Sequence, residues 1–315
     1  MLNIPNIQQA MSVFVAEELS EVLNTKVVIG RINMGLLNRI IIDDVLLDDQ
    51  SGQEMLKVTR LSAKFDIMPF FKGKISISSV QLFGFNINLR KETPDSPPNF
   101  KFVLDAFASK DTVKKENSLD LRINSILIRR GRMSYHVLSE EETPGKFNAK
   151  HIQLQNIIAN ISLKALSKDS LNLGIKRLSL DEKASGFSLK KMSLKLVANN
   201  KQTNIDNFTI ELPETSLKLD TIHLEYDSLK AFDRFTEQVH FSFRTLPSQV
   251  TLKDISPFVP ILSHFKEPVT LDMEVKGTVD QLTCSHLEIT ADDRQFRLRG
   301  DVSLQDLSRP QDARS

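Results

Sequence analysis

A short pattern of apolar residues, apolar-x-x-apolar-x-apolar, recurs along the chain and constrains its fold more than any other feature. Alternation with period two marks a strand with one apolar face. The two-residue gap shifts that alternation by one position, which is what a β-bulge does, and bulges bend a sheet. The pattern occurs at Ile29-Ile32-Met34, Ile42-Val45-Leu47, Val58-Leu61-Ala63, Ile77-Val80-Leu82, Ile123-Ile126-Ile128, Ala149-Ile152-Leu154, Ile175-Leu178-Leu180, Leu189-Met192-Leu194, Ile205-Phe208-Ile210, Leu219-Ile222-Leu224 and Cys284-Leu287-Ile289. The repetition predicts a curved, repetitive β-sheet.

The pattern is clearest in Lys74–Leu89, where alternation changes phase at Ser78-Ser79 and continues past Gly84. The phase change predicts a bulge. Gly84 has the permissive backbone of a tight turn, so the stretch is interpreted as a β-hairpin. The basic cluster Arg129-Arg130-Gly131-Arg132 is likewise interpreted as a solvated hairpin turn.

Helical spacing is rare. Residues 6–23 predict the clearest helix, because Ile7, Met11, Phe14, Val15, Leu19, Val22 and Leu23 form one stripe opposite three glutamates. Shorter helices are expected at 100–109, 229–238 and 255–265. The fold class is therefore mainly β: an elongated, highly twisted antiparallel sheet with a few short helices. The domain boundaries follow as an amphipathic helix at 1–24, one repetitive β unit at 25–307 and a polar tail at 308–315.

Composition excludes several classes of function. The net charge of +1 gives no reason to expect nucleic-acid binding, which needs a concentrated basic surface. The single cysteine, Cys284, excludes an internal disulfide and lies at an apolar strand position, where a cysteine packs. The longest uncharged run, residues 1–16, is too short and polar to span a membrane, and it lacks the pattern of a signal peptide.

Catalytic and metal-binding signatures are missing. The six histidines show no i, i+4 pair of the kind that binds zinc. The aspartates Asp43, Asp44, Asp48 and Asp49 lack the spacing of a calcium loop and are interpreted as turn residues. We find no phosphate-binding loop and no carboxylate pair marked out for acid–base chemistry. The sequence therefore predicts no enzyme, no cofactor and no metal.

The first 110 residues resemble the N-terminal part of the AsmA-like family, in particular its TamB-type (translocation and assembly module) members. The resemblance rests on an ordered set of loose motifs, namely Ile4–Gln8, Thr25–Gly30, Ile42–Asp49, Ile75–Leu89 and Asn99–Phe107. The remainder of the chain shares only the spacing of strands, including 276–282. The family's anchoring helix would precede Pro5, and its C-terminal domain has no counterpart here, so the chain resembles an excised N-terminal portion.

This resemblance implies a taco-like β-sheet with a hydrophobic groove, anchored in the inner membrane and projecting into the periplasm. Its implied function is that of a bridge-like lipid-transfer protein, which shields phospholipid acyl chains between the inner and outer membranes during outer-membrane biogenesis. The implied partners are phospholipids, the inner membrane through a helix missing from this chain, and an outer-membrane β-barrel protein through a missing C-terminal region. The alternative is a periplasmic scaffold or chaperone that assembles outer-membrane proteins by β-strand addition.

The residues predicted to line the groove are the apolar pairs that follow the phase change, because these are the most regularly apolar part of the repeat. They are Val80, Leu82, Ile126, Ile128, Met192, Leu194, Phe208, Ile210, Ile222 and Leu224. The competing interpretation is that these side chains pack on helices or on each other. No recurrent basic residue accompanies them, so the sequence predicts little preference for a lipid head group.

Overall fold

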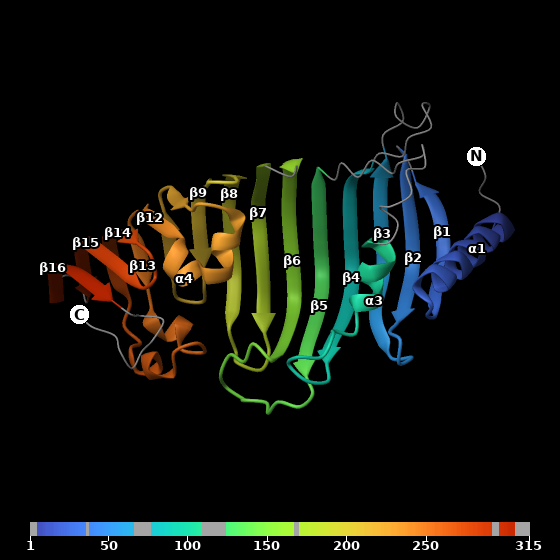
Figure 1. Cartoon of the computed structure of the whole chain (residues 1–315), viewed down its shortest axis with the longest axis horizontal. Helices are drawn as coiled ribbons and strands as arrows, with labels where there is room; N and C mark the ends of the chain where they lie inside the picture. The colour runs from blue at the N-terminus through green and yellow to red at the C-terminus, as the bar shows by residue number, and fades with distance from the viewer. Residues whose placement is uncertain are drawn as a thin grey trace. The chain divides into compact units, whose positions relative to one another are not determined.

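The computed structural model describes residues 5–35, 38–65, 77–108, 124–166, 170–291 and 296–305. Sixteen of its segments are strands, and they form one hydrogen-bonded sheet (Figure 1). The order is β1-β2-β3-β4-β5-β6-β7-β8-β9-β10-β13-β14-β12-β11, and β15 joins β14 to β16. The predicted fold class, mainly β with one large sheet and few helices, is confirmed.

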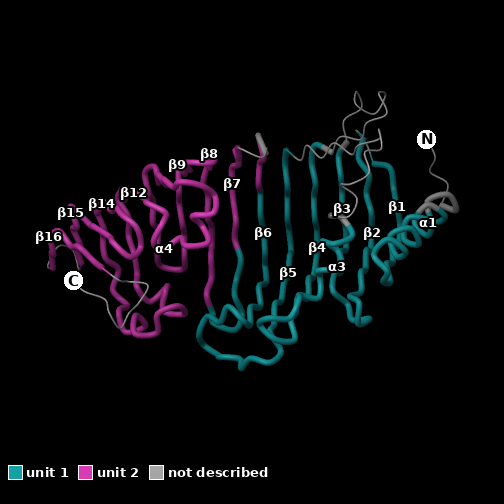
Figure 2. The backbone as a smooth tube through the Cα atoms, viewed as in Figure 1, with its two compact units in different colours: residues 1–160, 180–186 teal, residues 161–179, 187–315 magenta. Residues whose placement is uncertain are grey.

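Two compact units divide the chain, and they are coloured separately in Figure 2. Unit 1 contains residues 1–160 and 180–186, and unit 2 contains residues 161–179 and 187–315. The elements of the first part of the chain are α1 (Pro5–Leu23), β1 (Val27–Gly35), β2 (Arg39–Asp48), β3 (Glu54–Phe65), β4 (Ile77–Lys91), α3 (Lys101–Ala108), β5 (Ser125–Val137), β6 (His151–Leu166) and β7 (Ser170–Glu182).

Unit 2 contains shorter strands and several short helical segments. After β7 the elements are β8 (Ser188–Asn199), β9 (Gln202–Glu211), β10 (Ser216–Leu219), β11 (Ile222–Glu225), the 3₁₀ helix η2 (Leu229–Arg234), α4 (Phe235–Gln238), β12 (His240–Arg244), β13 (Ser248–Val250), η3 (Leu252–Ile255), η4 (Pro260–His264), β14 (Val269–Gly277), β15 (Gln281–Ala291) and β16 (Phe296–Gln305).

One pair of neighbouring strands is parallel, which departs from the predicted all-antiparallel sheet. β4 and β5 run in the same direction, with Leu82 opposite Ile128, whereas β1–β2, β2–β3, β3–β4 and β8–β9 are antiparallel pairs. Two parallel strands need a crossover connection, often a helix. The chain between β4 and β5 contains α3, so the predicted helix at 100–109 explains the parallel pair.

A line of irregular residues crosses the strands of unit 1. Four mid-strand residues have a positive φ of 55–64°, namely Asp44, Gly84, Arg130 and Asn156. Along this line the ladders between β1 and β4 leave out one residue of each strand, namely Gly30, Asp44, Thr59 and Gly84. We call this line the unit 1 crease. Irregular residues of this kind bend a strand, so the predicted curvature arises where neighbouring strands share the irregularity.

Unit 2 has a comparable interruption, in which whole strands are split. β9 pairs with β11 through Gln202–Ile205 and with β10 through Phe208–Glu211, while Asn207 between them has a φ of 54°. β14 is likewise paired by β13 on one side of Met273 and by β12 on the other. The Met273 amide donates to Thr245 Oγ1 at 2.8 Å, so a side chain replaces the missing ladder partner.

The N-terminal helix is confirmed at Pro5–Leu23, but its packing face differs from the predicted stripe. Ser12, Ala16 and Leu23 are buried, whereas Phe14 is 63% exposed and Val22 is 40% exposed. Apolar residues therefore lie on more than one side of α1. Val15, Leu19 and Leu23 of the predicted stripe pack toward the sheet, whereas Phe14 and Val22 face away from it. Asn24, with a φ of 48°, ends the helix in the left-handed conformation typical of a C-terminal cap.

Three other predictions about local structure are wrong. Gly84 is not a hairpin turn, because β4 continues from Ile77 to Lys91 and only bends there. The cluster Arg129–Arg132 is not a turn either, since it lies in the middle of β5. Residues 255–265 form no single helix; η3 and η4 flank a stretch that contains Pro257, and Pro260 restarts helical structure. The predicted tail at 308–315 lies outside the described residues.

Candidate functional site

Two rows of apolar side chains cross one face of β1–β5 in unit 1. Cross-strand partners lie on the same face of a sheet, and so do residues i and i+2 of one strand. The first row is Ile32, Ile42, Leu61, Leu82 and Ile128; the second is Met34, Ile40, Ala63, Val80 and Ile126. We call the surface formed by these two rows the unit 1 apolar face. It contains the four residues predicted for this unit, Val80, Leu82, Ile126 and Ile128.

Helices cover this face at its β1 end. Ile29, Ile32 and Leu47 are buried in a cluster with Ala16 and Leu23 of α1. Val15 and Leu19 of α1, together with Phe100, Phe102, Val103 and Ala106 around α3, also pack against this cluster. Two helices, α1 and α3, therefore remove the apolar surface at this end of the sheet from water.

The face is less covered toward β4 and β5. The second buried cluster of unit 1 is Val58, Phe85 and Ile157, with Leu82 and Ile128 packed against it. Within the described part of the chain, the partly buried apolar residues that pack on this cluster all belong to strands. Val80, Leu82, Ile126 and Ile128 remain half-buried, and Met34 of the second row is 63% exposed.

The opposite face of the same strands carries most of the charged side chains, with Phe83 among them. Arg31, Asp43, Arg60 and Gln81 alternate with the residues of the first row and line a cavity of about 520 Å³. Arg60 Nε lies 2.6 Å from Asp43 Oδ1, and the guanidinium of Arg130 lies 5.1 Å from the centre of the Phe83 ring. The sheet of unit 1 is therefore amphipathic, with a charged face and an apolar face.

The six predicted residues of unit 2 are also half-buried, and their surroundings differ. Met192 lies opposite Ile210 across β8 and β9, while Leu194 lies beside the irregularity at Asn207. Phe208 lies opposite the buried Leu219, and Ile222 opposite Ile205. Leu224 packs against Tyr226, Ala231 and Val239, so it contacts the η2–α4 segment as the competing interpretation expects.

Sequence reasoning missed the centre of the apolar cluster. Phe85 is 8% exposed, and its ring lies where a Cβ on Gly131 would be, 2.4 Å from Phe85 Cζ. The arginine-rich surroundings of Gly131 concealed this contact. Sequence reasoning also missed a contact between His136 and His151, described below, because the two residues lie at opposite ends of a loop rather than at helical spacing.

The sequence was compared with family models and with curated proteins. No family model matches the sequence, and no curated protein matches it. Among the helices of the described residues, none is both long enough and apolar enough to cross a membrane.

Proposed function

We propose that this protein holds the acyl chains of phospholipids against the apolar face of its sheet, as a segment of a bridge-like lipid-transfer protein. The observation that carries the proposal is the half-buried apolar surface of β4 and β5 in unit 1. Each CH₂ group moved out of water gains roughly 0.8 kcal/mol. An acyl chain laid along this surface would cover apolar atoms on both partners.

The two faces of the unit 1 sheet suit it to binding an apolar ligand in water. A charged face keeps the sheet in water, while the apolar face offers contact without hydrogen-bond donors aimed at a head group. The residues of the two apolar rows carry no charge. We therefore infer that binding selects for acyl chains rather than head groups, and that the protein acts by shielding lipids rather than by catalysis.

The resemblance to AsmA-like proteins supplies the proposed setting. In that setting the chain lies in the periplasm, is anchored to the inner membrane in the full-length protein, and carries phospholipids toward the outer membrane.

The test is to find lipid and to locate it. Protein purified without detergent would be extracted with organic solvent and analysed by mass spectrometry, with phospholipid as the expected result. A photo-reactive amino acid at Leu82 should then cross-link to phospholipid, while the same group at Gln81, on the opposite face, should not. Absence of lipid together with failure to take up a fluorescent phospholipid would refute the proposal.

One observation favours the alternative, assembly of outer-membrane proteins by strand addition. Among the described strands, β16 pairs only with β15, and eight of its ten residues are exposed. An unpaired edge can accept another strand. Under this alternative, a photo-reactive group at Leu298 of β16 would cross-link to an unfolded β-barrel protein, and the label at Leu82 would capture no lipid.

A further inference from the structure

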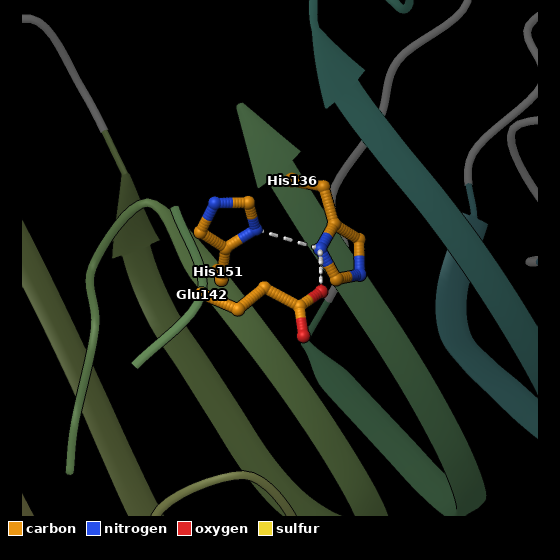
Figure 3. Close-up of side chains that lie close together, drawn as sticks. All are labelled: His136, Glu142 and His151. Carbon is orange, nitrogen blue, oxygen red and sulfur yellow. Dashed lines mark hydrogen bonds and ion pairs between the residues drawn. The ribbon is translucent and has the colours of Figure 1, made fainter. Parts of the chain in front are cut away.

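Two histidines and a glutamate meet at the connection between β5 and β6 in unit 1 (Figure 3). His136 is the second-last residue of β5, His151 is the first residue of β6, and Glu142 lies in the loop between them. We propose that these three side chains bind a divalent transition-metal ion, and that Zn²⁺ is the ion their donor atoms suit best. Imidazole nitrogen and carboxylate oxygen are both ordinary zinc ligands.

The ligand atoms are already close to the separations that a metal requires. His136 Nδ1 lies 3.0 Å from His151 Nδ1 and 3.8 Å from Glu142 Oε1. All three atoms lie within 4.8 Å of one another. A tetrahedral ion with bonds of about 2.0–2.2 Å holds its ligand atoms roughly 3.3–3.6 Å apart. The observed separations lie on both sides of this value, so small side-chain movements complete the geometry.

A second contact of His151 prepares its Nδ1 for a metal. His151 Nε2 lies 2.9 Å from the carbonyl oxygen of Glu140. A carbonyl oxygen only accepts hydrogen bonds, so Nε2 carries the proton. In the neutral ring Nδ1 is then left with a free lone pair. Metal-bound histidines characteristically donate their other ring N–H to a backbone carbonyl or carboxylate in this way.

The Nε2–H tautomer of His151 also determines which ring donates the hydrogen bond between the two histidines. His151 Nδ1 is the acceptor, so His136 Nδ1 is the donor of the 3.0 Å contact. A metal ion replaces this proton and binds both nitrogens. The His136 ring is 24% exposed, so it can carry the displaced proton on Nε2 and remain neutral. Two imidazoles that share one proton beside a carboxylate thus become two metal ligands without a net change of charge on the rings.

The backbone around the cluster is tied at several points. Val137 N donates to Lys150 O at 2.9 Å, which joins the two ends of the loop next to the histidines. Ser139 N donates to Glu92 O at 3.0 Å, and Gly145 N donates to Ala184 O at 2.9 Å. These bonds fix the backbone of the loop on both sides of Glu142. A preorganised backbone reduces what metal binding must spend on ordering the ligands.

The neighbouring charges favour Glu142 as the carboxylate ligand. Glu140 is occupied, because its Oε2 lies 2.5 Å from Lys150 Nζ. The Glu142 side chain is 62% exposed, and its Oε1 lies 3.8 Å from His136 Nδ1. Beside it lies a cavity of about 200 Å³, lined in part by Asn148, His151 and Gln153. This volume is sufficient for a water molecule as the fourth ligand, the arrangement of three protein ligands and one open position.

A bound ion would fasten the 138–150 loop to the two strands that it connects. The consequence is measurable as ligand-dependent stability, because a ligand that binds only the folded chain raises its melting temperature. The inference concerns residues away from the unit 1 apolar face, so it stands or falls independently of lipid binding.

The experiment uses the full chain without a polyhistidine tag, freed of metal with EDTA and exchanged into metal-free buffer. Calorimetric titration with Zn²⁺ alone should give one site per chain. Co²⁺, which reports a tetrahedral site by its visible absorption, should bind to the same site and be displaced by Zn²⁺. Zn²⁺ should raise the melting temperature of the wild-type chain.

Three variants decide the matter. His136→Gln and Glu142→Gln should each weaken Zn²⁺ binding by at least about tenfold and remove the rise in melting temperature. Glu142 is exposed, so Glu142→Gln should fold normally even if His136→Gln does not. The matched control is His223→Gln in unit 2, whose ring lies 3.0 Å from Glu225 Oε1, and it should leave Zn²⁺ binding unchanged. Absence of a Zn²⁺ site, or a site insensitive to Glu142→Gln, would overturn the proposal.

Discussion

Gly84 of β4 lies opposite Thr59 of β3 at the centre of the unit 1 crease, and the contact leaves no room for a side chain. A Cβ atom on Gly84 would lie 2.7 Å from Thr59 Oγ1 and 3.1 Å from Thr59 Cβ. Gly84 also has a φ of +64°, a backbone conformation that residues with a Cβ atom rarely adopt. The bend of β4 therefore depends on glycine for two separate reasons.

The first prediction is that Gly84→Ala destabilises the fold by more than its backbone conformation alone explains. An alanine in the left-handed region costs about 1–2 kcal/mol, and the steric conflict with Thr59 should bring the loss to about 2–4 kcal/mol. The free energy of unfolding from denaturant titration measures it.

Gly52 provides the matched control for this variant. It has a φ of +78°, but no atom lies within 4 Å of the position that a Cβ would take there, so Gly52→Ala carries the backbone cost without the clash. Equal losses in the two variants would mean that Thr59 imposes no steric constraint on β4.

The case of Gly84 illustrates how far the fold could be predicted from the sequence. The phase change in the apolar pattern correctly indicated irregular strands. Apolar residues are kept on the buried face, so a one-residue shift in their spacing requires a matching irregularity in the backbone. It did not separate a bulge from a turn, since both use glycine and both interrupt alternation. Arg130 was harder still, because nothing in an arginine suggests a mid-strand φ of 55°.

The candidate site was predictable only in part, for a similar reason. Period-two alternation placed Val80 and Leu82 on one face with Ile126 and Ile128, as the strand register has them. Which part of that face the helices cover depends on long-range packing, which alternation does not encode. The contact of Leu224 with the η2–α4 segment is of this kind.

The second prediction concerns the buried carboxylate of Asp49, in the turn between β2 and β3. Asp49 is 2% exposed, and its Oδ2 lies 2.7 Å from Arg90 of β4. It also accepts hydrogen bonds from Ser51, Gln53 and Asn99. Asp49→Asn leaves Arg90 without its anionic partner and should cost about 2–4 kcal/mol of unfolding free energy. Asp105→Asn, in the exposed Lys101–Asp105 pair, should change stability little.

The third prediction is that this loss depends on pH. Burial alone would raise the pKa of Asp49, but hydrogen bonds from Ser51, Asn99 and Gln53 outweigh burial and lower the pKa below its ordinary 3.8. A lowered pKa in the folded state stabilises the fold above the unfolded-state pKa, and this contribution disappears as pH falls through the folded-state pKa. The difference in unfolding free energy between wild type and Asp49→Asn should therefore be largest at pH 7 and become smaller below about pH 4. A difference that stays constant to pH 2 would contradict the assignment.

The fourth prediction is that Cys284 is unreactive in the folded protein. Its side chain is 7% exposed in β15, and burial, followed by the nearby charge of Asp301, raises the pKa of the thiol. Because the thiolate is the reacting species, a disulfide reagent at pH 8 should modify the native chain at least about tenfold more slowly than the chain in denaturant. Equal rates would mean that β15 opens freely in solution.

The last prediction distinguishes an apolar residue available to lipid from one that is packed. Ile126 is half-buried on the unit 1 apolar face and belongs to neither buried cluster of that unit, whereas Leu224 packs against Tyr226, Ala231 and Val239. Ile126→Asp should lower the unfolding free energy by less than about 1 kcal/mol, because water solvates the new charge. It should nevertheless reduce the phospholipid that co-purifies, since an acyl chain would have to contact an unpaired charge. Leu224→Asp should instead cost about 2–4 kcal/mol, because the charge is forced among buried side chains. Denaturant titration and lipid mass spectrometry on the same preparations make the comparison. Unchanged lipid content in a stable Ile126→Asp protein would remove this part of the face from the proposed path.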